Sequence, residues 1–551
     1  MGKKVIIVGG VAAGASAAAR LRRMDEEAEI IVFERGEYVS FANCGLPYYA
    51  GGVIKNRNKL LVQTPESLYR RFNIDVRVMS EVLSIQPEQK TVEVRNIPED
   101  KVYTESYDYL VLCPGAAPII PDIEGVDKSN VFTLRNVPDG DIIKGYINSY
   151  RPTRATVVGA GFIGLEIAEM LKLNGLDVSI IEAAPQVMGV LDYEMAAIVQ
   201  DYLKAQDINL YLSDKLIALE GESKAEQVIL ASGQKIATDL VILGVGVRPE
   251  SRLAWEAGLA IGATGGILVD EYLRTSDPNI YAAGDAIQIK DIVTSEDFLL
   301  PMASPANRQG WLIANNIAGK AIPYTGAQGT AIVKIFDMVA ATTGRNAKVL
   351  QRLGQDYQVC HTYPASHATY YPGASEMTLK IIFTPDEGKL LGAQIVGFEG
   401  VDKRIDVLAT AIRAGMTVFD LQELELAYAP PFSSAKDPVN LAGYTAGNIV
   451  NKHIIPVYWQ EVAQLLNLGA YLLDVRTPAE FAAGAADGAH NIPVDDLRNH
   501  LNEIPRDREI LVYCRTGLRS YIACRLLTQH GYRVKNINGG YKLYVQPGNS
   551  Q

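Results

Sequence analysis

The chain has 551 residues, of which 48% are hydrophobic and 21% are charged, and its net charge at pH 7 is -11. This length exceeds what one hydrophobic core serves, so we expect several domains, and the acidic balance disfavours nucleic acid or an anionic membrane as the main partner. The five cysteines show no CxxC spacing, which argues against a zinc ribbon and against a disulfide framework.

The N-terminal segment carries lysines, an apolar run and small residues, and so imitates a signal peptide. We interpret it as a strand that enters a phosphate-binding turn, because its glycines and an acidic strand end fit that pattern. No apolar run reaches about 18 residues, so we expect no membrane span. A reducing cytoplasm is the compartment consistent with unpaired cysteines.

Residues 3–35 and 154–185 repeat one pattern: an apolar strand, a glycine turn, a helix with apolar residues at three- and four-residue spacing, and a second strand ending in Glu. Such glycines let the backbone approach a pyrophosphate, which rests on the helix N-terminus. The second copy matches GxGxxG fully, with an acidic strand end: Gly159, Gly161, Gly164 and Glu182. The first copy has Gly9, Gly14 and Glu34, with Val11 at the middle glycine. Each Glu would bind a ribose diol, and Glu182 would repel a 2′-phosphate, which favours NADH over NADPH.

Between and after these copies lie further apolar strands. Residues 109–125 contain one that Pro and Gly stop, and residues 266–286 contain one that ends at Gly284 and Asp285. Residues 326–446 combine strands, including a hairpin within 379–397, with a helix at 404–416. The pattern lapses from about 446 to 460, and we place a domain boundary there.

Roughly residues 1–446 resemble the pyridine nucleotide-disulfide oxidoreductase family. The resemblance is carried by the two dinucleotide folds, the segment YAAGDA and the α+β region, taken together. The segments SFANCGLPYY and LAYAPPFSSAKDPVN narrow the resemblance to the coenzyme A-disulfide reductase branch. The tail, with LLDVRTPAEF and ILVYCRTGLRSYIACRLL, resembles a rhodanese domain. The implied fold class is α/β with two Rossmann-like domains, an α+β dimerisation domain and a rhodanese domain. The implied domains are FAD-binding 1–115 plus 255–325, NAD(P)H-binding 116–254, dimerisation 326–446, a linker 447–458 and rhodanese 459–551.

The resemblance implies FAD, NADH and/or NADPH, and coenzyme A as bound molecules, with Asp285 holding the flavin ribityl chain. The residues implied for FAD are Gly9, Gly14, Glu34, Arg35, Gly284 and Asp285. The implied substrate is coenzyme A disulfide, coenzyme A persulfide or polysulfide.

Cys44 is the candidate redox residue, because Asn43 and Gly45 interrupt the pattern beside the flavin site. Tyr49 stands where related reductases place a second cysteine, so we expect the sulfur partner to come from the substrate as a mixed disulfide with coenzyme A. Apart from Cys44 and Cys514, the chain has three cysteines, and we interpret them as ordinary buried residues: Cys113, Cys360 and Cys524.

The resemblance further implies a homodimer in which tyrosines of the opposite subunit reach the disulfide. The matching positions are Tyr428 and Tyr370, with Tyr371 as a rival, and a phenol would protonate the leaving thiolate. Simple packing at an interface is the alternative for both. The candidates for binding coenzyme A are Ser16, Arg20, Arg23, Ser40, Asn43, Arg71, Asn307 and Lys436. Solvated helix faces remain the alternative for the charged ones. The six histidines show no metal-binding spacing, so we propose no metal.

Cys514 ends an apolar strand and opens a loop that runs into a helix, where backbone amides would stabilise a thiolate or persulfide. The rest of this persulfide loop is Arg515, Thr516, Gly517, Leu518 and Arg519. It is one residue shorter than the C-x5-R loop of tyrosine-type phosphatases, which fits sulfur better than phosphate. We interpret Asp474 and Arg476 as loop support.

Three other functions compete with a reductase. An NADH oxidase or peroxidase would cycle one cysteine through sulfenic acid, although Ala12 and Ala13 stand where the peroxidases place a histidine. A sulfur carrier acting on a partner protein is the second, and a flavin-bound scaffold without turnover is the third. Cys44 argues against the scaffold.

Overall fold

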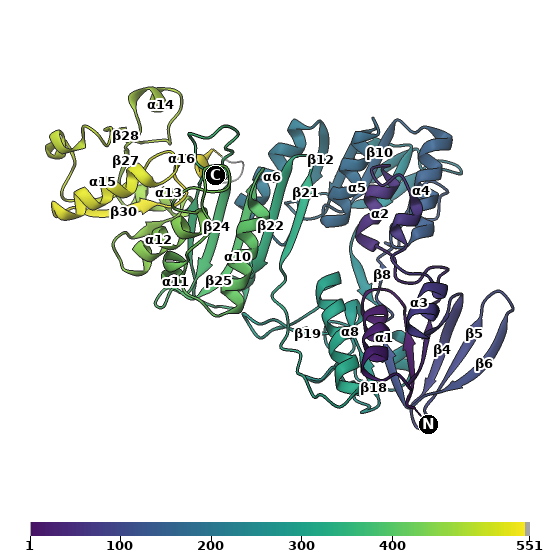
Figure 1. The fold of residues 1–551 in the computed structure, drawn as a ribbon. Coiled ribbons are helices and arrows are strands. Elements are labelled where there is room, and N and C mark those ends of the chain that lie inside the picture. Colours follow the sequence, from purple (N-terminus) through teal and green to yellow (C-terminus); the bar gives the residue numbers. More distant parts are fainter. Residues whose placement is uncertain (1, 546–551) are drawn as a thin grey trace. The chain divides into compact units, whose positions relative to one another are not determined.

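A computed structural model of the chain describes residues 2–545, which form two compact units. One unit comprises the residues up to 185 together with 207–327, and the other comprises 186–206 together with the described residues from 328 onward. Figure 1 shows the elements of both units with their labels. Among residues 2–545, no helix combines the length and the apolarity that crossing a bilayer requires.

The first unit contains a parallel five-stranded sheet around the N-terminal glycine motif. Its strands in spatial order are β18 Ile280–Ala282, β7 Tyr109–Leu112, β1 Lys4–Val8, β2 Glu29–Phe33 and β3 Asp75–Arg77. The helix α1 Ala12–Met24 connects β1 to β2, and α8 Ala303–Ile317 packs against α1. The apolar residues of β1 and β2 are buried, as expected for strands covered on both faces.

A second parallel sheet in the same unit contains the second glycine motif. Its strands in spatial order are β12 Ile208–Leu212, β11 Asp177–Glu182, β10 Arg154–Val158, β16 Leu240–Leu243 and β9 Val131–Phe132. The helix α5 Phe162–Leu173 connects β10 to β11, which pair in parallel. Both predicted dinucleotide-binding folds are therefore confirmed. The remaining helices of this unit are α2 Leu46–Ala50, α3 Pro65–Phe72, α4 Val137–Tyr150 and α7 Arg252–Glu256.

Two small antiparallel sheets flank the parallel ones. Their strands are β4 Ser80–Gln86, β5 Thr91–Asn96 and β6 Lys101–Ser106 in one, and β13 Leu216–Glu220, β14 Gln227–Leu230 and β15 Lys235–Ala237 in the other. Two-stranded pairs are formed by β8 Ala116–Pro118 with β17 Val247–Pro249 and by β19 Ile289–Lys290 with β20 Asp297–Phe298.

The second unit begins with an antiparallel sheet, which matches the α+β region predicted for its sequence. In spatial order the strands are β21 Ala331–Ile335, β22 Met338–Gly344, β25 Leu390–Gly397, β24 Thr378–Phe383 and β23 Gln358–Thr362. β24 and β25 form the predicted hairpin, and α10 Val401–Arg413 is the predicted helix. The other helices here are α6 Tyr193–Ala205, α9 Ala347–Arg352 and α11 Val418–Glu423.

A buried ionic cluster fixes α6 against this sheet. Lys380 on β24 lies 2.7 Å from the carboxylate of Asp192 and also pairs with Glu194, whose carboxylate is 3.2 Å from the His361 ring. Burial opposes the charge on Lys380, but the carboxylates of Glu194 and Asp192 raise its pKa above the usual value. The cluster therefore holds an ammonium that depends on both partners.

The helix α12 Pro438–Val450 runs across residue 446, where the sequence predicted a domain boundary. Gly443 and Gly447 weaken the helical pattern in the sequence because glycine has low helix propensity. They serve close packing: a Cβ at Gly443 would lie 2.8 Å from the Leu421 side chain on α11. The division of the chain into five segments stays a prediction.

The C-terminal region folds into a third parallel sheet, as predicted. In spatial order the strands are β26 Pro456–Val457, β30 Arg533–Ile537, β29 Glu509–Tyr513, β27 Tyr471–Asp474 and β28 His490–Asn491. The helices around it are α13 Trp459–Asn467, α14 Pro478–Ala482, α15 Leu518–Gln529 and α16 Gly540–Tyr544. The predicted fold class is confirmed, with two Rossmann-like folds, an α+β region and this α/β region.

Candidate functional site

The turn between β1 and α1 is shaped for close approach of a ligand to the backbone. Gly9 has a φ of +95°, and a Cβ there would lie 2.1 Å from the Cys113 carbonyl oxygen. A Cβ at Gly14 would lie 1.9 Å from the Gly9 carbonyl oxygen. The Glu34 carboxylate accepts hydrogen bonds from the backbone N–H groups of Gly10 and Gly36, both at 2.9 Å. This arrangement places an acid beside the turn, as a ribose site requires.

Gly284 and Asp285 lie just after β18, at the carboxyl end of the same sheet. Gly284 has a φ of +80° and donates its N–H to Gln309 Oε1 at 2.7 Å. Burial raises the pKa of Asp285. A half-buried carboxyl that hydroxyl groups would satisfy fits a flavin ribityl chain, so these residues and the first turn fit FAD. Arg35, also predicted for this site, pairs with Glu81 at 3.7 Å and with Glu250 at 3.4 Å.

The turn between β10 and α5 repeats this geometry. A Cβ at Gly159 would lie 2.3 Å from the Gly244 carbonyl oxygen, and one at Gly164 would lie 2.0 Å from the Gly159 carbonyl oxygen. By contrast, apart from the two chain neighbours, no described residue has an atom within 4 Å of a Cβ added at Gly161, which leaves that side open for a pyrophosphate. The Glu182 carboxylate accepts hydrogen bonds from the N–H groups of Ala160 at 2.8 Å and Ala184 at 2.9 Å.

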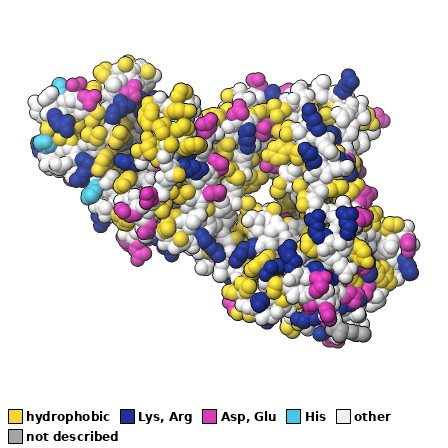
Figure 2. Space-filling view, viewed as in Figure 1, with side chains coloured by type: hydrophobic (Ala, Val, Ile, Leu, Met, Phe, Trp, Pro, Cys, Tyr) yellow, Lys and Arg dark blue, Asp and Glu magenta, His cyan; other side chains and the backbone are white. Residues whose placement is uncertain are grey.

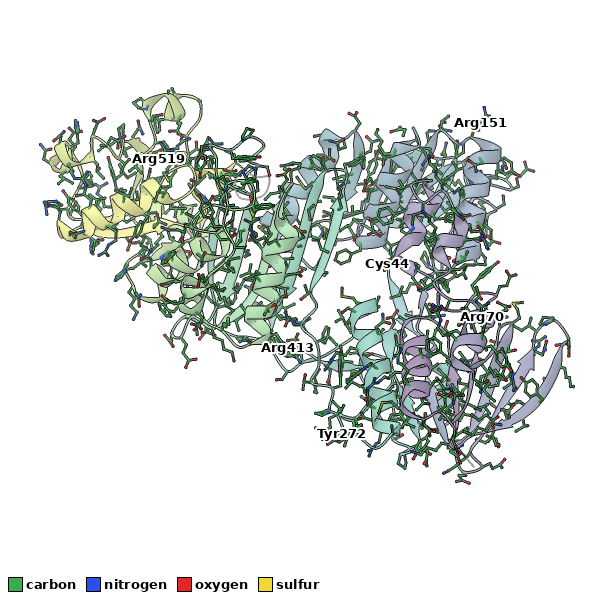
Figure 3. The ribbon with its side chains drawn as sticks, viewed as in Figure 1. Cys44, Arg70, Arg151, Tyr272, Arg413 and Arg519 are labelled. Atoms are coloured by element: carbon green, nitrogen blue, oxygen red, sulfur yellow. The ribbon has the colours of Figure 1, made fainter. Side chains whose placement is uncertain are left out.

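Cys44 lies in the 3-10 turn Asn43–Gly45, directly before α2, and is exposed (Figure 3). Partial burial of its sulfur and the Glu166 carboxylate raise the pKa of the Cys44 thiol. Tyr48, one helical turn later, donates its hydroxyl to Glu166 Oε1 at 3.2 Å. Burial also raises the pKa of Glu166 itself. The thiol therefore lies beside an acid and a phenol that share a hydrogen bond.

Glu166 and Tyr48 were not among the residues singled out from the sequence. The available signal was a glutamate on α5, two residues after Gly164, in a largely apolar helix. A carboxylate on an apolar helix needs a partner or a function.

Tyr49 occupies the position of the absent second cysteine and has a structural role. Its side chain is buried, and its hydroxyl donates to Asp141 Oδ1 at 2.7 Å. Burial and this hydrogen bond raise the pKa of Tyr49 to about 12. Arg57 also donates to Asp141, at 2.7 Å from Oδ2. Tyr49 thus ties α2 to α4, and among the described residues no disulfide involves Cys44.

Several of the candidate coenzyme A residues gather along α1 and α8. Ser16 donates to Asn307 Oδ1 at 2.5 Å, and Arg20 donates to Asn315 Oδ1 at 3.0 Å. The Arg20 guanidinium also lies 5.1 Å from the centroid of the Trp311 ring. Figure 2 shows Lys and Arg side chains grouped over this part of the first unit. The structure thus brings Ser16, Arg20 and Asn307 together.

The remaining candidates are less closely grouped. Arg23 is exposed on the last turn of α1, and Arg71 is exposed on the last turn of α3. Ser40 has a φ of +48° and donates its N–H to the Gly10 carbonyl oxygen at 2.8 Å, next to the first glycine turn. Lys436 belongs to the other unit, where its ammonium lies 5.1 Å from the Tyr444 ring centroid.

Tyr370 and Tyr428, 58 residues apart, meet on the surface of the second unit. Their hydroxyl groups lie 2.8 Å apart, and both side chains are exposed. The hydrogen bond with Tyr428 raises the pKa of Tyr370. The rival Tyr371 instead packs edge-on against the His367 ring, with the centroids 5.7 Å apart. Two paired phenols at one exposed position suit proton donation to a ligand from outside the unit.

Cys514 follows β29 and is buried, and its loop runs into α15 as predicted. The Gly517 N–H donates to Cys514 Sγ at 3.1 Å. Gly517 has a φ of +124°, a conformation that favours glycine. Arg515 and Leu518 are exposed, whereas Thr516 is half-buried. The loop therefore aims a backbone amide at the sulfur and exposes its rim.

Two ion pairs support this loop. Arg519 donates to both carboxylate oxygens of Glu480 on α14, at 2.6 and 2.8 Å, and this bidentate contact lowers the pKa of Glu480 to about 2. Arg476 pairs with the buried Asp474 at 2.6 Å. The guanidinium of Arg519 is thus directed to a carboxylate of the same domain.

The other cysteines have environments typical of core residues. Burial raises the pKa of Cys113 and of Cys360 to about 12, and it raises the pKa of Cys524 as well. Within residues 2–545, no group of three or more His, Cys, Asp and Glu side chains is placed to hold a metal ion.

Comparison with protein families matches three consecutive parts of the chain. The pyridine nucleotide-disulphide oxidoreductase model matches residues 3–310, the dimerisation domain of the same family matches 330–438, and the rhodanese-like domain matches 459–546. A coenzyme A disulfide reductase of Staphylococcus haemolyticus (strain JCSC1435) is 38% identical over 448 residues, which are 81% of this chain and 100% of the relative.

Solved structures extend the similarity over the whole chain. The crystal structure of reduced Bacillus anthracis CoADR-RHD is 52% identical with a TM-score of 0.97, and the match covers 99% of this chain and 98% of that one. An NAD-dependent persulfide reductase from A. fulgidus is 38% identical with a TM-score of 0.92, covering 98% and 100%. A water-forming NADH oxidase from Lactobacillus brevis is 28% identical with a TM-score of 0.78, covering 82% and 99%.

Proposed function

The chain belongs to the pyridine nucleotide-disulphide oxidoreductase family, in the coenzyme A-disulfide reductase type with a C-terminal rhodanese-like domain, and we propose that it reduces coenzyme A disulfide and coenzyme A persulfide with NADH or NADPH. The observation that carries this proposal is Cys44, an exposed thiol close to Glu166 and Asp285, with a buried Tyr49 where a second cysteine would stand. A thiol without an internal partner needs a sulfur from the substrate.

FAD and NAD(P)H are the cofactors that this family implies, whereas coenzyme A is a substrate rather than a cofactor. Gly9, Gly14, Glu34 and Asp285 would hold FAD, and the turn with Glu182 would hold the nicotinamide nucleotide. When bound, the flavin supplies a two-electron relay from the nicotinamide to a disulfide. Glu182 would repel the 2′-phosphate of NADPH, so NADH is the preferred donor in this proposal.

The proposed sulfur chemistry has Cys44 as its centre. The Cys44 thiolate attacks one sulfur of coenzyme A disulfide, a mixed disulfide forms, and one coenzyme A thiolate leaves with a proton. Two electrons then cleave the mixed disulfide, which regenerates the Cys44 thiolate and releases the second coenzyme A. With coenzyme A persulfide, the same sequence releases sulfide and coenzyme A. Inorganic polysulfide would react at the same thiolate.

The paired hydroxyl groups of Tyr370 and Tyr428 suit the proton donor for the leaving thiolate. In the proposed homodimer, these tyrosines of one subunit would serve Cys44 of the other. The basic side chains near α1, including Arg20, would receive the phosphates of coenzyme A.

Cys514 is proposed to carry a sulfane sulfur, because the Gly517 amide donates to its Sγ and the loop opens toward the surface. A persulfide on Cys514 could pass its outer sulfur to the coenzyme A thiol, which would give the reductase its persulfide substrate. The reducing cytoplasm would keep both cysteines available.

Anaerobic NADH consumption by the purified protein, with coenzyme A persulfide and with coenzyme A disulfide, tests the proposal. We expect both substrates to be reduced by wild type and Cys514→Ser, and neither by Cys44→Ser. A Cys113→Ser variant is the matched control, because Cys113 is a half-buried thiol of the same unit that has no proposed role in the chemistry.

Two of the competing functions, an NADH oxidase and a sulfur carrier acting on a partner protein, predict different results in this assay. The water-forming NADH oxidase among the similar structures makes oxygen the alternative acceptor. Rapid NADH consumption with oxygen and none with either coenzyme A substrate would replace the reductase with an oxidase. If Cys514→Ser, but not Cys44→Ser, abolished sulfur release, a sulfur carrier acting on a partner would take its place.

A further inference from the structure

The outer edge of the β23 strand is covered by side chains of the C-terminal domain. β23 is the last strand of its sheet, so its outward N–H and C=O groups have no neighbouring strand. Asn538 donates Nδ2–H to the Val359 carbonyl oxygen at 2.8 Å and accepts from the His361 N–H at 3.2 Å. The Val359 N–H donates to the Tyr458 hydroxyl at 3.2 Å. The Asn538 side-chain amide thus forms with this edge the two hydrogen bonds that a residue of a neighbouring strand would form.

The residues that follow Asn538 contact the sulfur loop. The Tyr541 N–H donates to the Cys514 carbonyl oxygen at 2.8 Å, and the Lys542 N–H donates to the Arg515 carbonyl oxygen at 3.0 Å. A Cβ at Gly540 would lie 2.7 Å from both carbonyl oxygens, so this backbone lies directly against the loop. Residues 538–542, which we name the loop strut, therefore join β23 to the first two peptides of the loop.

Further contacts hold the loop strut from both sides. The Tyr363 hydroxyl, from just beyond the end of β23, donates to the Gly539 carbonyl oxygen at 2.9 Å, and Lys542 pairs with Glu376. The Trp459 indole N–H donates to the Gly540 carbonyl oxygen at 2.8 Å. β23 is itself fixed, because His361 lies against Glu194 of the buried ionic cluster. The loop strut therefore has fixed contacts both with the antiparallel sheet and with the C-terminal domain.

We propose that the β23 edge, acting through Asn538 and the loop strut, positions the Cys514 loop for sulfur transfer. Hydrogen bonds to the carbonyl groups of Cys514 and Arg515 fix the first two peptide planes of the loop. The position of the Gly517 amide, which donates to the sulfur, follows from those planes. Asn538 is thus a positioning residue, and the reactivity of Cys514 depends on the antiparallel sheet. This inference rests on the proposed role of Cys514 as sulfur carrier.

The test compares Asn538→Ala with Tyr458→Phe in the full-length protein. Tyr458→Phe loosens the same β23 edge but leaves the loop strut intact, so it is the matched control. The measurements are thiosulfate:cyanide sulfurtransferase kinetics, the alkylation rate of Cys514 by iodoacetamide at pH 7, and NADH-dependent reduction of coenzyme A disulfide. Asn538→Ser keeps an uncharged hydroxyl group that can donate or accept but reaches less far than the amide, so it gives an intermediate variant.

We expect Asn538→Ala to lower the sulfurtransferase kcat roughly tenfold, with KM for thiosulfate changed less than twofold, as for a misplaced reacting group. Alkylation of Cys514 should slow in parallel, Asn538→Ser should lie between wild type and Asn538→Ala, and reduction of coenzyme A disulfide should stay at the wild-type rate. Wild-type kinetics in Asn538→Ala, or an equal loss in Tyr458→Phe, would overturn the inference.

Failure of the proposed function has a different signature. If the wild-type protein transfers no sulfur from thiosulfate, the carrier role fails, but the alkylation rates still report whether Asn538 positions the Cys514 loop. Unfolding of the C-terminal domain in a variant is recognised by faster cleavage of that domain by a protease and by a lower midpoint of urea unfolding, and Asn538→Ser then carries the comparison.

Discussion

Alanine substitution of two glycines in the second nucleotide turn should separate folding from nucleotide binding. At Gly164 the new Cβ would lie 2.0 Å from the Gly159 carbonyl oxygen, and no side-chain rotation relieves a contact with backbone. Overpacking of this kind costs about 1–3 kcal/mol. At Gly161 the φ is -81° and no heavy atom lies within 4 Å of the new Cβ. We therefore expect Gly164→Ala to lower the free energy of unfolding by about 2 kcal/mol and Gly161→Ala to change it by less than about 0.5 kcal/mol.

Gly161→Ala, which should keep its stability, should weaken the binding of NADH. The methyl group of Gly161→Ala occupies the space left for the pyrophosphate, so KM for NADH should rise roughly tenfold, equivalent to about 1.4 kcal/mol. Urea unfolding and steady-state kinetics measure the two effects, with flavin absorbance as the check on the first nucleotide fold. An unchanged KM in Gly161→Ala, or a Gly164→Ala protein as stable as wild type, would refute this reasoning.

Three further substitutions test the sites away from that turn. Burial is the first cause of the raised pKa of Cys44 and the Glu166 carboxylate is the second, so Glu166→Gln should lower that pKa. The pH profile of Cys44 alkylation should therefore move to lower pH. A move to higher pH would contradict the assigned cause. Lys380→Met leaves two buried carboxylates uncompensated and should cost about 3–5 kcal/mol in urea unfolding, so a wild-type midpoint would count against the cluster. Tyr428→Phe breaks the contact with Tyr370 and should lower kcat for coenzyme A disulfide roughly tenfold while NADH reduction of ferricyanide stays constant; equal losses in both assays would exclude a role at the disulfide.

The parts that could be predicted from the sequence are those encoded locally. A glycine turn, its helix and its second strand lie within about 35 residues, so the period of apolar residues and the glycine spacing suffice to predict both nucleotide folds. The loop after Cys514 is predicted for the same reason. Glu166 was missed because its relation to Cys44 joins residues 122 positions apart, as counted from their numbers. Nothing in either local sequence encodes that distance.

Long-range contacts also explain the other differences from the sequence interpretation. The sequence pattern lapses near residue 446, yet α12 continues through it, and Gly443 allows α11 and α12 to pack closely. The sequence places Arg519 in the persulfide loop, and its partner Glu480, on α14, accepts two of its hydrogen bonds. In both cases the partner lies in another element, and only the folded chain brings the residues together.

The loop strut gives a structural reason why a rhodanese-like domain is joined to this reductase. A domain tethered only by a linker would need no paired contacts with its neighbour, and its cysteine would react as it does in isolation. Here the Asn538 amide completes the edge of β23, and the backbone two to four residues later holds the Cys514 loop. Because the same sheet carries the Lys380 cluster, the geometry at Cys514 is set by residues far from it in sequence. The fusion therefore supplies Cys514 with part of its structural support as well as joining it to a reductase in one chain.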